Sequence, residues 1–384
     1  MVRRRRVSVA GAVVIAAALG LAPAAGASDG PARSYLFAPS FASNTVTVFD
    51  VDTGELVKYI GAEARGPCCA HATPDGSTVF VVDGLSPYVT VIDVATLEVT
   101  QLIRLSGTWG DRGTPIQHDG RLFWISNLPE GHVEAIDTHT GEVVRTFPFM
   151  ANTFTVSRDG ETLYSVNLTA LPTAFSLSAM TFASRSAATG QVIGIAHLPL
   201  ALVGVPLKVY ASPDDTKVYV QLFNSAGTVH VVDVRDRSRP RYVKTFRVGS
   251  VPIDAVFTSD GTQMWFPNSG DGTVAIVDVS TDEVVHVIDV GHYVAGVAIL
   301  DEKAFVSISP GPLPPTAPTS QVLLFAGLIP GAILIPPSGS SQYHPLFQLP
   351  GEIRLYDTHT YQRMPVAPMT TPSVSHVMEI VPAH

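Results

Sequence analysis

The chain has 384 residues, of which 46% are hydrophobic and 15% charged, and its formal net charge is −9 at pH 7. A chain with this surplus of acidic residues cannot neutralise a run of phosphate groups, so its composition excludes nucleic acid as an expected partner. The length alone would suit two or three domains, unless an internal repeat governs the fold.

The first residues have the three parts of an export signal. The arginines Arg3–Arg6 precede an apolar run from Val7 to about Ala22, and small residues follow at Ala25–Ala27. We predict a signal peptide over residues 1–27 that is removed on export, by the general or the twin-arginine route, which leaves a secreted or otherwise extracytoplasmic protein. An uncleaved anchor is the alternative, although the apolar run is short for a membrane span. Cleavage would remove four arginines and no acidic residue, so the net charge would move from −9 to −13.

After this segment, one pattern recurs with a period in the low forties. Runs of four to seven β-branched and aromatic residues alternate in polarity and show no helical period. In most repeats an aspartate closes such a run before a short turn, at Asp50, Asp93, Asp137, Asp233, Asp278 and Asp357. A second aspartate marks a PDG-like turn, at Asp75, Asp119, Asp159, Asp214 and Asp260. A period of this length, with four short strands in each repeat, predicts the blades of a β-propeller.

The TVxVID runs, the TG turns after them and the SPDG-like turns followed by VYV resemble the YVTN-type β-propeller repeat family. The resemblance covers nearly all of the mature chain and implies a fold but no particular activity. With seven repeats, the predicted fold is all-β: a seven-bladed β-propeller of four-stranded antiparallel blades.

The two ends of the repeat region complement each other. The first repeat begins at Tyr35 with the pattern of a second strand, and Pro372–Pro382 has the pattern of a first strand with nothing after it. We therefore expect this C-terminal strand to close the ring, with residues 28–384 forming a single domain.

Irregular segments are expected to gather on one face of the ring. The turns between first and second strands, and between third and fourth strands, are short and lie on one face. The other, loop-rich face receives an expanded segment at Thr169–Ser184 in blade 4 and an apolar, Pro-rich insert at about 310–350 in blade 7. The second insert could cover the channel, bind a partner or membrane surface, or pack on its own blade. Prolines break it, so we expect no transmembrane segment after the signal.

The innermost strands can be aligned by counting back from the turn aspartates. This places Cys69, Lys208 and Asp254 six residues before the turn, and His71 and Tyr210 four residues before it. Applied to the closing strand, the same alignment gives Val374 the position equivalent to Cys69 and His376 the position equivalent to His71. Positions two apart share one face of a strand, so these side chains are expected to converge on the channel if the register is right.

The chain has only two cysteines, Cys68 and Cys69, and they are adjacent in the connection that leads from blade 1 into the first strand of blade 2, called the crossing below. In an exported chain they are expected to close a vicinal disulfide that stiffens this crossing, with two buried thiols as the alternative. With His71 and His376 they could instead bind copper or zinc. A vicinal disulfide against a quinone cofactor, as in quinoprotein alcohol dehydrogenases, is a third interpretation that rests on the cysteine pair alone.

Lys208 and Asp254 are expected to form an ion pair between neighbouring inner strands, or else an acid–base pair for lyase or lactonase chemistry. Four further side chains near the channel rim are candidate ligand contacts: Arg112, Asn152, Tyr210 and His292. They are equally compatible with ordinary solvated loops.

Together, these patterns predict an exported propeller that binds a small molecule or a protein through its loop-rich face. The alternative is an enzyme at the channel mouth, either a metal- or quinone-linked oxidoreductase or a lyase- or lactonase-like catalyst. The sequence contains no G-x-S-x-G elbow, P-loop, HExxH or dinucleotide fingerprint that would favour another enzyme class.

Overall fold

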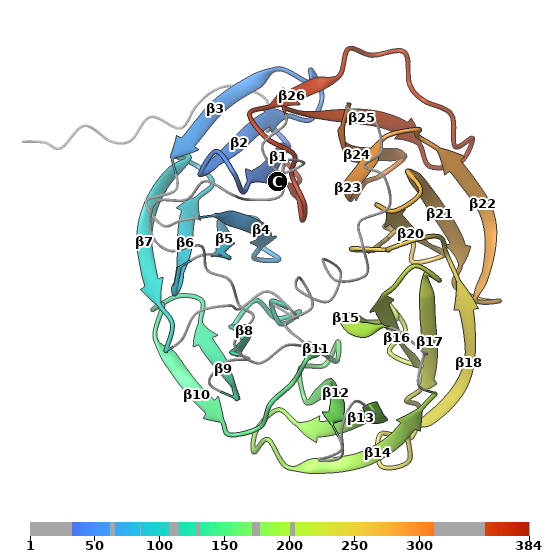
Figure 1. Cartoon of the computed structure of the whole chain (residues 1–384). Helices are drawn as coiled ribbons and strands as arrows, with labels where there is room; N and C mark the ends of the chain where they lie inside the picture. Colours follow the sequence, from blue (N-terminus) through green and yellow to red (C-terminus); the bar gives the residue numbers. More distant parts are fainter. Residues whose placement is uncertain are drawn as a thin grey trace, which may run out of the picture. The chain divides into compact units, whose positions relative to one another are not determined.

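The computed structural model describes the following residues: 33–61, 66–84, 86–106, 115–127, 131–170, 177–199, 204–310 and 350–383. Residues 33–384 form one compact unit. Its described part contains seven β-sheets and no helix, and the sheets stand as blades around a central axis (Figure 1). The predicted seven-bladed β-propeller is therefore confirmed. Over the same residues, no helix has the length and apolar character that crossing a membrane requires.

The strands are short and follow the blade order of the chain. Blades 1 and 2 contain β1 (Tyr35–Ser40), β2 (Thr45–Asp50), β3 (Leu56–Gly61), β4 (Pro67–Ala72), β5 (Thr78–Asp83), β6 (Tyr88–Asp93) and β7 (Glu98–Arg104). Blades 3 and 4 contain β8 (Leu122–Asn127), β9 (His132–Asp137), β10 (Val143–Phe147), β11 (Thr153–Val156), β12 (Thr162–Ala170), β13 (Leu177–Ser186) and β14 (Val192–Leu198). Blades 5 and 6 contain β15 (Val205–Ala211), β16 (Lys217–Phe223), β17 (Thr228–Asp233), β18 (Arg241–Arg247), β19 (Val256–Phe257), β20 (Gln263–Asn268), β21 (Thr273–Asp278) and β22 (Glu283–Asp289). Blade 7 contains β23 (Tyr293–Leu300), β24 (Lys303–Ser309), β25 (Gly351–Asp357) and β26 (Met369–Thr371), and the last strand is β27 (Glu379–Val381).

The C-terminal strand β27 is the innermost strand of blade 1. The order of that sheet is β27-β1-β2-β3, and the pairing is antiparallel, with Tyr35 opposite Val381 and Phe37 opposite Glu379. The two ends of the propeller sequence thus share one sheet, and β1 has no open inner edge. The prediction that the C-terminal strand closes the ring is confirmed.

Blade 3 is the least regular blade. Its sheet has the three strands β8, β9 and β10, and the inner position is taken by a segment that meets β8 at one bridge, between Ile116 and Phe123. Two backbone hydrogen bonds hold this segment: Gln117 N–H donates to Leu122 O at 2.8 Å, and Trp124 N–H donates to Pro115 O at 3.1 Å. Proline has no N–H to donate, so Pro115 limits the pairing available to this inner strand.

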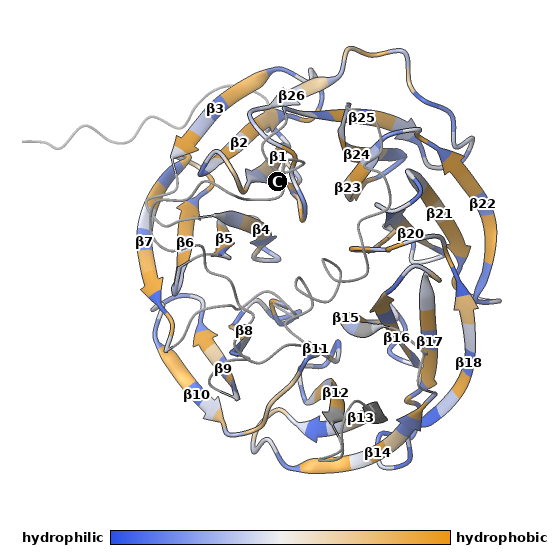
Figure 2. Cartoon of the chain, in the orientation of Figure 1, coloured by the Kyte–Doolittle hydropathy of each residue, from blue (hydrophilic) through white to orange (hydrophobic). Residues whose placement is uncertain are grey.

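Burial between neighbouring blades explains why the repeat forms a ring. The third residue of the second strand is aromatic and 0% exposed in every blade: Phe37, Phe80, Trp124, Tyr164, Tyr219, Trp265 and Phe305. Each hydrophobic cluster joins two blades, as where Val229 and Val231 of blade 5 pack with Phe266 of blade 6. The outermost strands instead carry exposed apolar side chains, such as Val192 and Ile195 of β14 (Figure 2). The apolar core therefore lies between the inner strands of adjacent blades.

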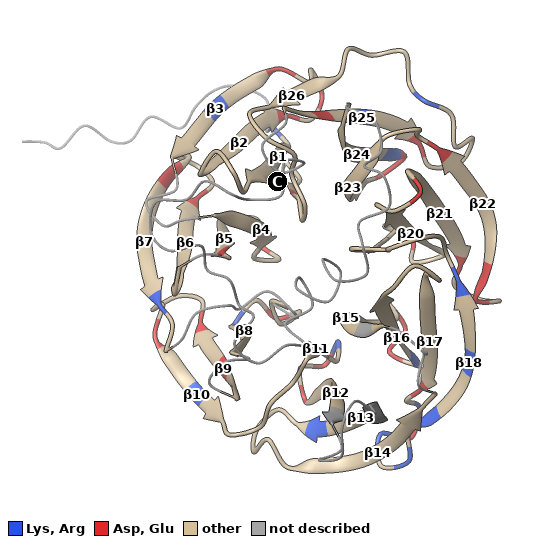
Figure 3. Ribbon diagram, in the orientation of Figure 1, with Lys and Arg blue, Asp and Glu red and all other residues tan. Residues whose placement is uncertain are grey.

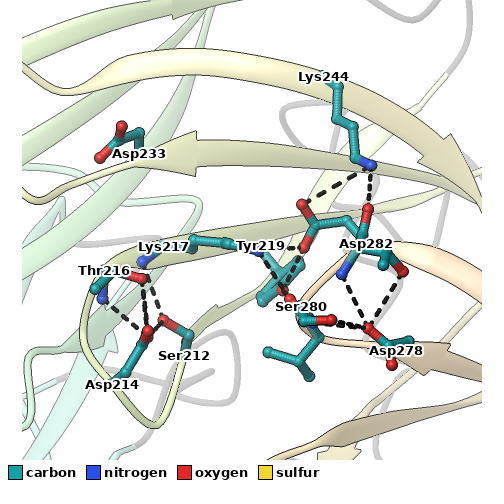
Figure 4. Close-up of polar contacts among 12 residues, drawn as sticks. Ser212, Asp214, Thr216, Lys217, Tyr219, Asp233, Lys244, Asp278, Ser280 and Asp282 are labelled. Atoms are coloured by element: carbon teal, nitrogen blue, oxygen red, sulfur yellow. Dashed lines mark hydrogen bonds and ion pairs between the residues drawn. The ribbon is translucent and has the colours of Figure 1, made fainter.

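The repeated aspartates organise the short turns on the face opposite the loop-rich one, which we call the tight-turn face. The Asp278 carboxylate accepts hydrogen bonds from the Ser280 hydroxyl at 2.6 Å and from Thr281 N–H at 2.9 Å (Figure 4). These two bonds hold the pKa of Asp278 below its ordinary value. The turn ends at Asp282, whose φ of 54° is a conformation that Asp tolerates better than most residues. The aspartate repeat found in the sequence is thus a turn signal.

Candidate functional site

A cavity of about 280 Å³ lies at the centre of the ring. Its walls come from the inner segments of all seven blades, and most of the lining is apolar. Five ionisable side chains also line it: His71, Lys208, Tyr210, Asp254 and Glu379. Most other charged residues lie on outer strands and in turns (Figure 3), so this small polar group is set apart from the surface charge of the described propeller. We call it the axial site.

A hydrogen bond links two of these side chains across neighbouring blades. The Tyr210 hydroxyl, on β15 of blade 5, donates to Asp254 Oδ1 of blade 6 at 2.8 Å. Asp254 is 7% exposed, and the Tyr210 ring packs against the apolar cluster between these two blades. The contact holds the Asp254 carboxylate at the cavity wall. Lys208 precedes Tyr210 by two residues on the same strand and lines the same cavity.

The carboxyl group of Glu379 completes the axial site. Burial raises the pKa of Glu379, hydrogen bonds from the backbone N–H groups of Ala72 and Ile380 lower it, and the negative charge of Asp254 raises it; the net result is a pKa of about 7. A group with this pKa can hold or release a proton near neutral pH. The axial site therefore combines a buried aspartate, a lysine, a tyrosine and a glutamic acid that titrates near neutrality.

The closing segment has a different register from the expected one. Glu379 pairs with Phe37 as His71 pairs with Phe80, so Glu379 is the blade 1 equivalent of His71 in blade 2. The expected alignment, which gave this position to His376, is therefore wrong by three residues. The cavity lining includes Val377–Ile380 of this segment but not His376.

A second cavity, of about 370 Å³, adjoins the first near the tight-turn face. The two share Pro115, Thr155 and Tyr210, and the second continues to the turn residues His118 and Arg158. Both of these side chains are exposed. This opening was not predicted from the sequence, although the polar residues His118 and Arg158, each directly before a turn aspartate, could have indicated it.

The cysteine pair lies beside the axial site rather than inside it. Cys69 is 1% exposed and packs with Phe80 and Phe123 in the core between blades 2 and 3. The two Sγ atoms are 3.0 Å apart, with the Cys69 thiol donating to Cys68 Sγ, so the predicted disulfide is not formed in this structure. Among the described residues, no group of three or more His, Cys, Asp or Glu side chains is placed to hold a metal ion. The predicted set of the two cysteines with His71 and His376 is not assembled into such a group.

The other predicted ligand contacts have varied positions. Tyr210 lines both cavities. Asn152 lies just before β11, and its Oδ1 accepts a hydrogen bond from Leu168 N–H at 2.9 Å, which ties β11 to β12. His292 is half-buried before β23 and is not among the lining residues. Arg112, the predicted signal peptide and residues 311–349 of the blade 7 insert lie outside the described residues.

A second polar cluster joins blades 5 and 6 away from both cavities (Figure 4). Lys217 Nζ forms an ion pair with Asp282 Oδ1 at 2.9 Å, and the Tyr219 hydroxyl donates a hydrogen bond to the same oxygen at 2.6 Å. Lys244 approaches the other carboxylate oxygen at 3.9 Å. Asp282 is 6% exposed. This Asp282 cluster fastens the turn of blade 6 to the strands of blade 5 and has a structural role.

The buried carboxyl group of Asp83, at the end of β5, should make the stability of the fold depend on pH. It is 1% exposed, and burial raises its pKa from 3.8 to about 7, against a lowering hydrogen bond from Thr90. At pH values between 3.8 and about 7, Asp83 keeps its proton in the folded chain but has released it in the unfolded chain. Raising the pH from 4 to 7 should therefore cost stability, at up to about 1.4 kcal/mol per pH unit. Asp83→Asn should lose this contribution, so its free energy of unfolding relative to wild type should rise over that range. Urea titrations at several pH values measure this difference, and a pH-independent difference would contradict the assignment.

Comparisons with known proteins show the fold alone. Neither a protein-family model nor a curated protein matches this sequence, so the YVTN family is not confirmed. Among solved structures, the chain is similar to "Kuenenia stuttgartiensis Hydrazine Synthase", with a TM-score of 0.58 and 18% identity over 74% of this chain and 94% of that chain. It is also similar to a functionally unknown protein from Desulfotomaculum acetoxidans DSM 771, with a TM-score of 0.64 and 11% identity over 91% of this chain and 99% of that one. At these identities the likeness establishes a shared architecture, and the function has to be argued from the axial site.

Proposed function

We propose that the protein is an exported binding propeller that holds a small polar ligand at the axial site. One observation carries the proposal: inner segments from all seven blades meet around one cavity, where Lys208, Tyr210, Asp254 and Glu379 lie among apolar walls. Binding sites for small molecules have this character, with a few placed polar groups in a mainly hydrophobic hollow. The volume of about 280 Å³ suits a ligand smaller than a typical drug.

The predicted signal peptide supports a place of action outside the cytoplasm. The mature chain would carry a formal net charge of −13, because cleavage at residue 27 removes four arginines and no acidic residue. A field of this sign favours the approach of neutral and cationic molecules over anions. In this proposal the propeller works as a receptor or carrier in the extracytoplasmic space.

A ligand screen on the mature chain, residues 28–384, tests the proposal. Thermal-shift measurements with small amines, amino acids, sugars and carboxylic acids should reveal at least one stabilising class. Asp254→Asn and Tyr210→Phe should each weaken binding of that class by about tenfold, as expected for loss of a buried polar contact. Asp289→Asn, an exposed change on the outer strand β22, is the matched control and should bind as wild type does. If every class fails to bind, or if binding survives both axial variants unchanged, the proposal is wrong.

An enzyme of the lyase or lactonase type is the second candidate. It is favoured by Glu379, whose pKa of about 7 suits a general acid or base, in one cavity with Lys208 and Tyr210. Glu379 would remove or return a proton next to a carbonyl group, and Lys208 would stabilise the developing negative charge. In this case Glu379→Gln should abolish turnover of a bound substrate while leaving its affinity within about threefold. If a ligand binds but is recovered unchanged, the enzyme role is wrong and only the binding role remains.

A further inference from the structure

The two cysteines are placed for reaction with each other. Their Sγ atoms are 3.0 Å apart, and Cys68 is half-buried while Cys69 is 1% exposed. A Cβ atom built on Gly84 would lie 3.7 Å from Cys68 Sγ and 3.0 Å from the Phe41 ring, so the surroundings of Cys68 are closely packed. Because Cys68 is the more exposed of the two residues, a reagent would meet Cys68 Sγ first, with Cys69 Sγ directly behind it.

The ring-closing segment is fastened to the peptide between these cysteines. The carbonyl oxygen of Cys68 accepts a hydrogen bond from Val377 N–H at 3.3 Å, and Ala70 N–H donates to Val377 O at 3.1 Å. This is a parallel bridge between Cys69 and Val377, outside the regular pairing of β27 with β1. The Val377 side chain packs against the same apolar cluster as both cysteines.

The disulfide ring would include the backbone peptide between the two cysteines. Its eight atoms are the two Sγ, two Cβ and two Cα atoms together with the carbonyl carbon and nitrogen of the Cys68–Cys69 peptide. Forming the bond has to shorten the Sγ–Sγ distance from 3.0 Å to about 2.0 Å within this small ring, which strains and rotates that peptide. The carbonyl group that holds Val377 N–H belongs to that same peptide, so it moves with it.

From these contacts we infer that Cys68 and Cys69 form a redox-sensitive site that controls how firmly the ring-closing segment is held. A disulfide donor RSSR would be attacked by the Cys68 thiolate, which forms a mixed disulfide and releases one RSH. The Cys69 thiolate then attacks the Cys68 sulfur, the intramolecular disulfide forms, and the second RSH leaves. The two cysteines lose two electrons and two protons, and RSSR gains them. The accompanying peptide rotation weakens the bridge to Val377.

This change would reach the axial site through a short length of chain. Val377, Met378, Glu379 and Ile380 all line the cavity, and Glu379 is two residues beyond the bridge. Oxidation would therefore shift the Glu379 carboxyl relative to Lys208 and Asp254. This consequence rests on the proposed ligand site, whereas the loosening of the segment does not.

Hydrogen–deuterium exchange on the mature chain tests the inference without any ligand. After treatment with oxidised glutathione, intact mass should fall by about 2 Da, the two hydrogens lost from the thiols. Peptides that cover residues 373–381 should then exchange about tenfold faster than in the reduced protein. Peptides from β20 and β21 of blade 6 should exchange at the same rate in both forms.

Cys68→Ser and Cys69→Ser are the control variants, because neither can form the intramolecular bond. Each should show the same exchange in residues 373–381 with and without the oxidant. If Cys69→Ser fails to fold, since its side chain lies in the core, the half-buried Cys68→Ser still supplies the control. Loss of about 2 Da with unchanged exchange would overturn the coupling, and no mass loss with oxidised glutathione would overturn the redox site. Neither result depends on whether the ligand screen succeeds.

Discussion

Truncation after Thr371 is expected to abolish the folded propeller. It removes β27 and four apolar side chains that are at most 8% exposed: Val374, Met378, Ile380 and Val381. At roughly 1.5–3 kcal/mol for each buried side chain, this loss approaches the whole stability of a typical domain. It also leaves β1 with an unpaired inner edge that can pair with other chains. Circular dichroism melting and size-exclusion chromatography should show an unfolded or aggregated product.

A shorter truncation gives the matched control. Removing residues 382–384 leaves the pairing of β27 with β1 intact. Among the described residues it deletes only the exposed Pro382 and Ala383, together with a hydrogen bond from Ala383 N–H to the Ser34 hydroxyl. This variant should melt within a few degrees of wild type. If truncation after Thr371 also gave a monomer with an unchanged melting temperature, closure by the C-terminal strand would not be what holds the ring together.

Asp282→Asn should produce the largest loss of stability from a single substitution in the described polar clusters. It leaves Lys217 beside a neutral amide at a site where its side chain is 18% exposed. Breaking a buried ion pair by removing one partner typically costs about 3–5 kcal/mol. Asparagine tolerates the positive φ at this position, so the change tests the charge rather than backbone strain. The free energy of unfolding in urea measures the effect.

The exposed pair of Lys58 and Glu98 provides the comparison. It links β3 to β7, and the side chain of Glu98 is 70% exposed. Glu98→Gln should change the free energy of unfolding by less than about 1 kcal/mol, because water screens a surface pair. If Asp282→Asn were no more damaging than Glu98→Gln, the Asp282 cluster would not fasten blades 5 and 6 together.

The sequence predicted the architecture because the same physical requirements recur in every blade. Each repeat needs an aspartate to accept hydrogen bonds from its turn and an aromatic residue to fill the core between blades, so both types of residue mark the period. The strand that closes the ring could also be predicted, since a first strand was missing at one end and present at the other. Blade 3 departs from the pattern where Pro115 restricts the inner pairing.

The details of the axial site were harder to predict. Alignment from the turn aspartates placed four residues that do line the cavity: His71, Lys208, Tyr210 and Asp254. It also placed Cys69 at the channel, and that prediction is wrong, because Cys69 lies in the core between blades 2 and 3. No turn follows the closing strand, so its register had no internal reference, and Glu379 was missed. The alternation of Met378, Glu379 and Ile380 carried the missing signal, because the two apolar residues pack in the core between blades 7 and 1. In the same way, adjacency of the cysteines gave no indication that Cys69 lies in the core rather than in the channel.

The titration of Glu379 tests most directly whether the closing strand completes a buried polar site at the axis. Carbon-13 NMR of glutamate-labelled protein that comprises residues 28–384, with Glu379→Gln used to assign the resonance, reports the pKa of this one carboxyl group. We expect a pKa of about 7, well above the ordinary glutamate value of 4.5. A pKa near 4.5 would place the carboxyl group in water, and would contradict both the register of β27 and the axial site built on it.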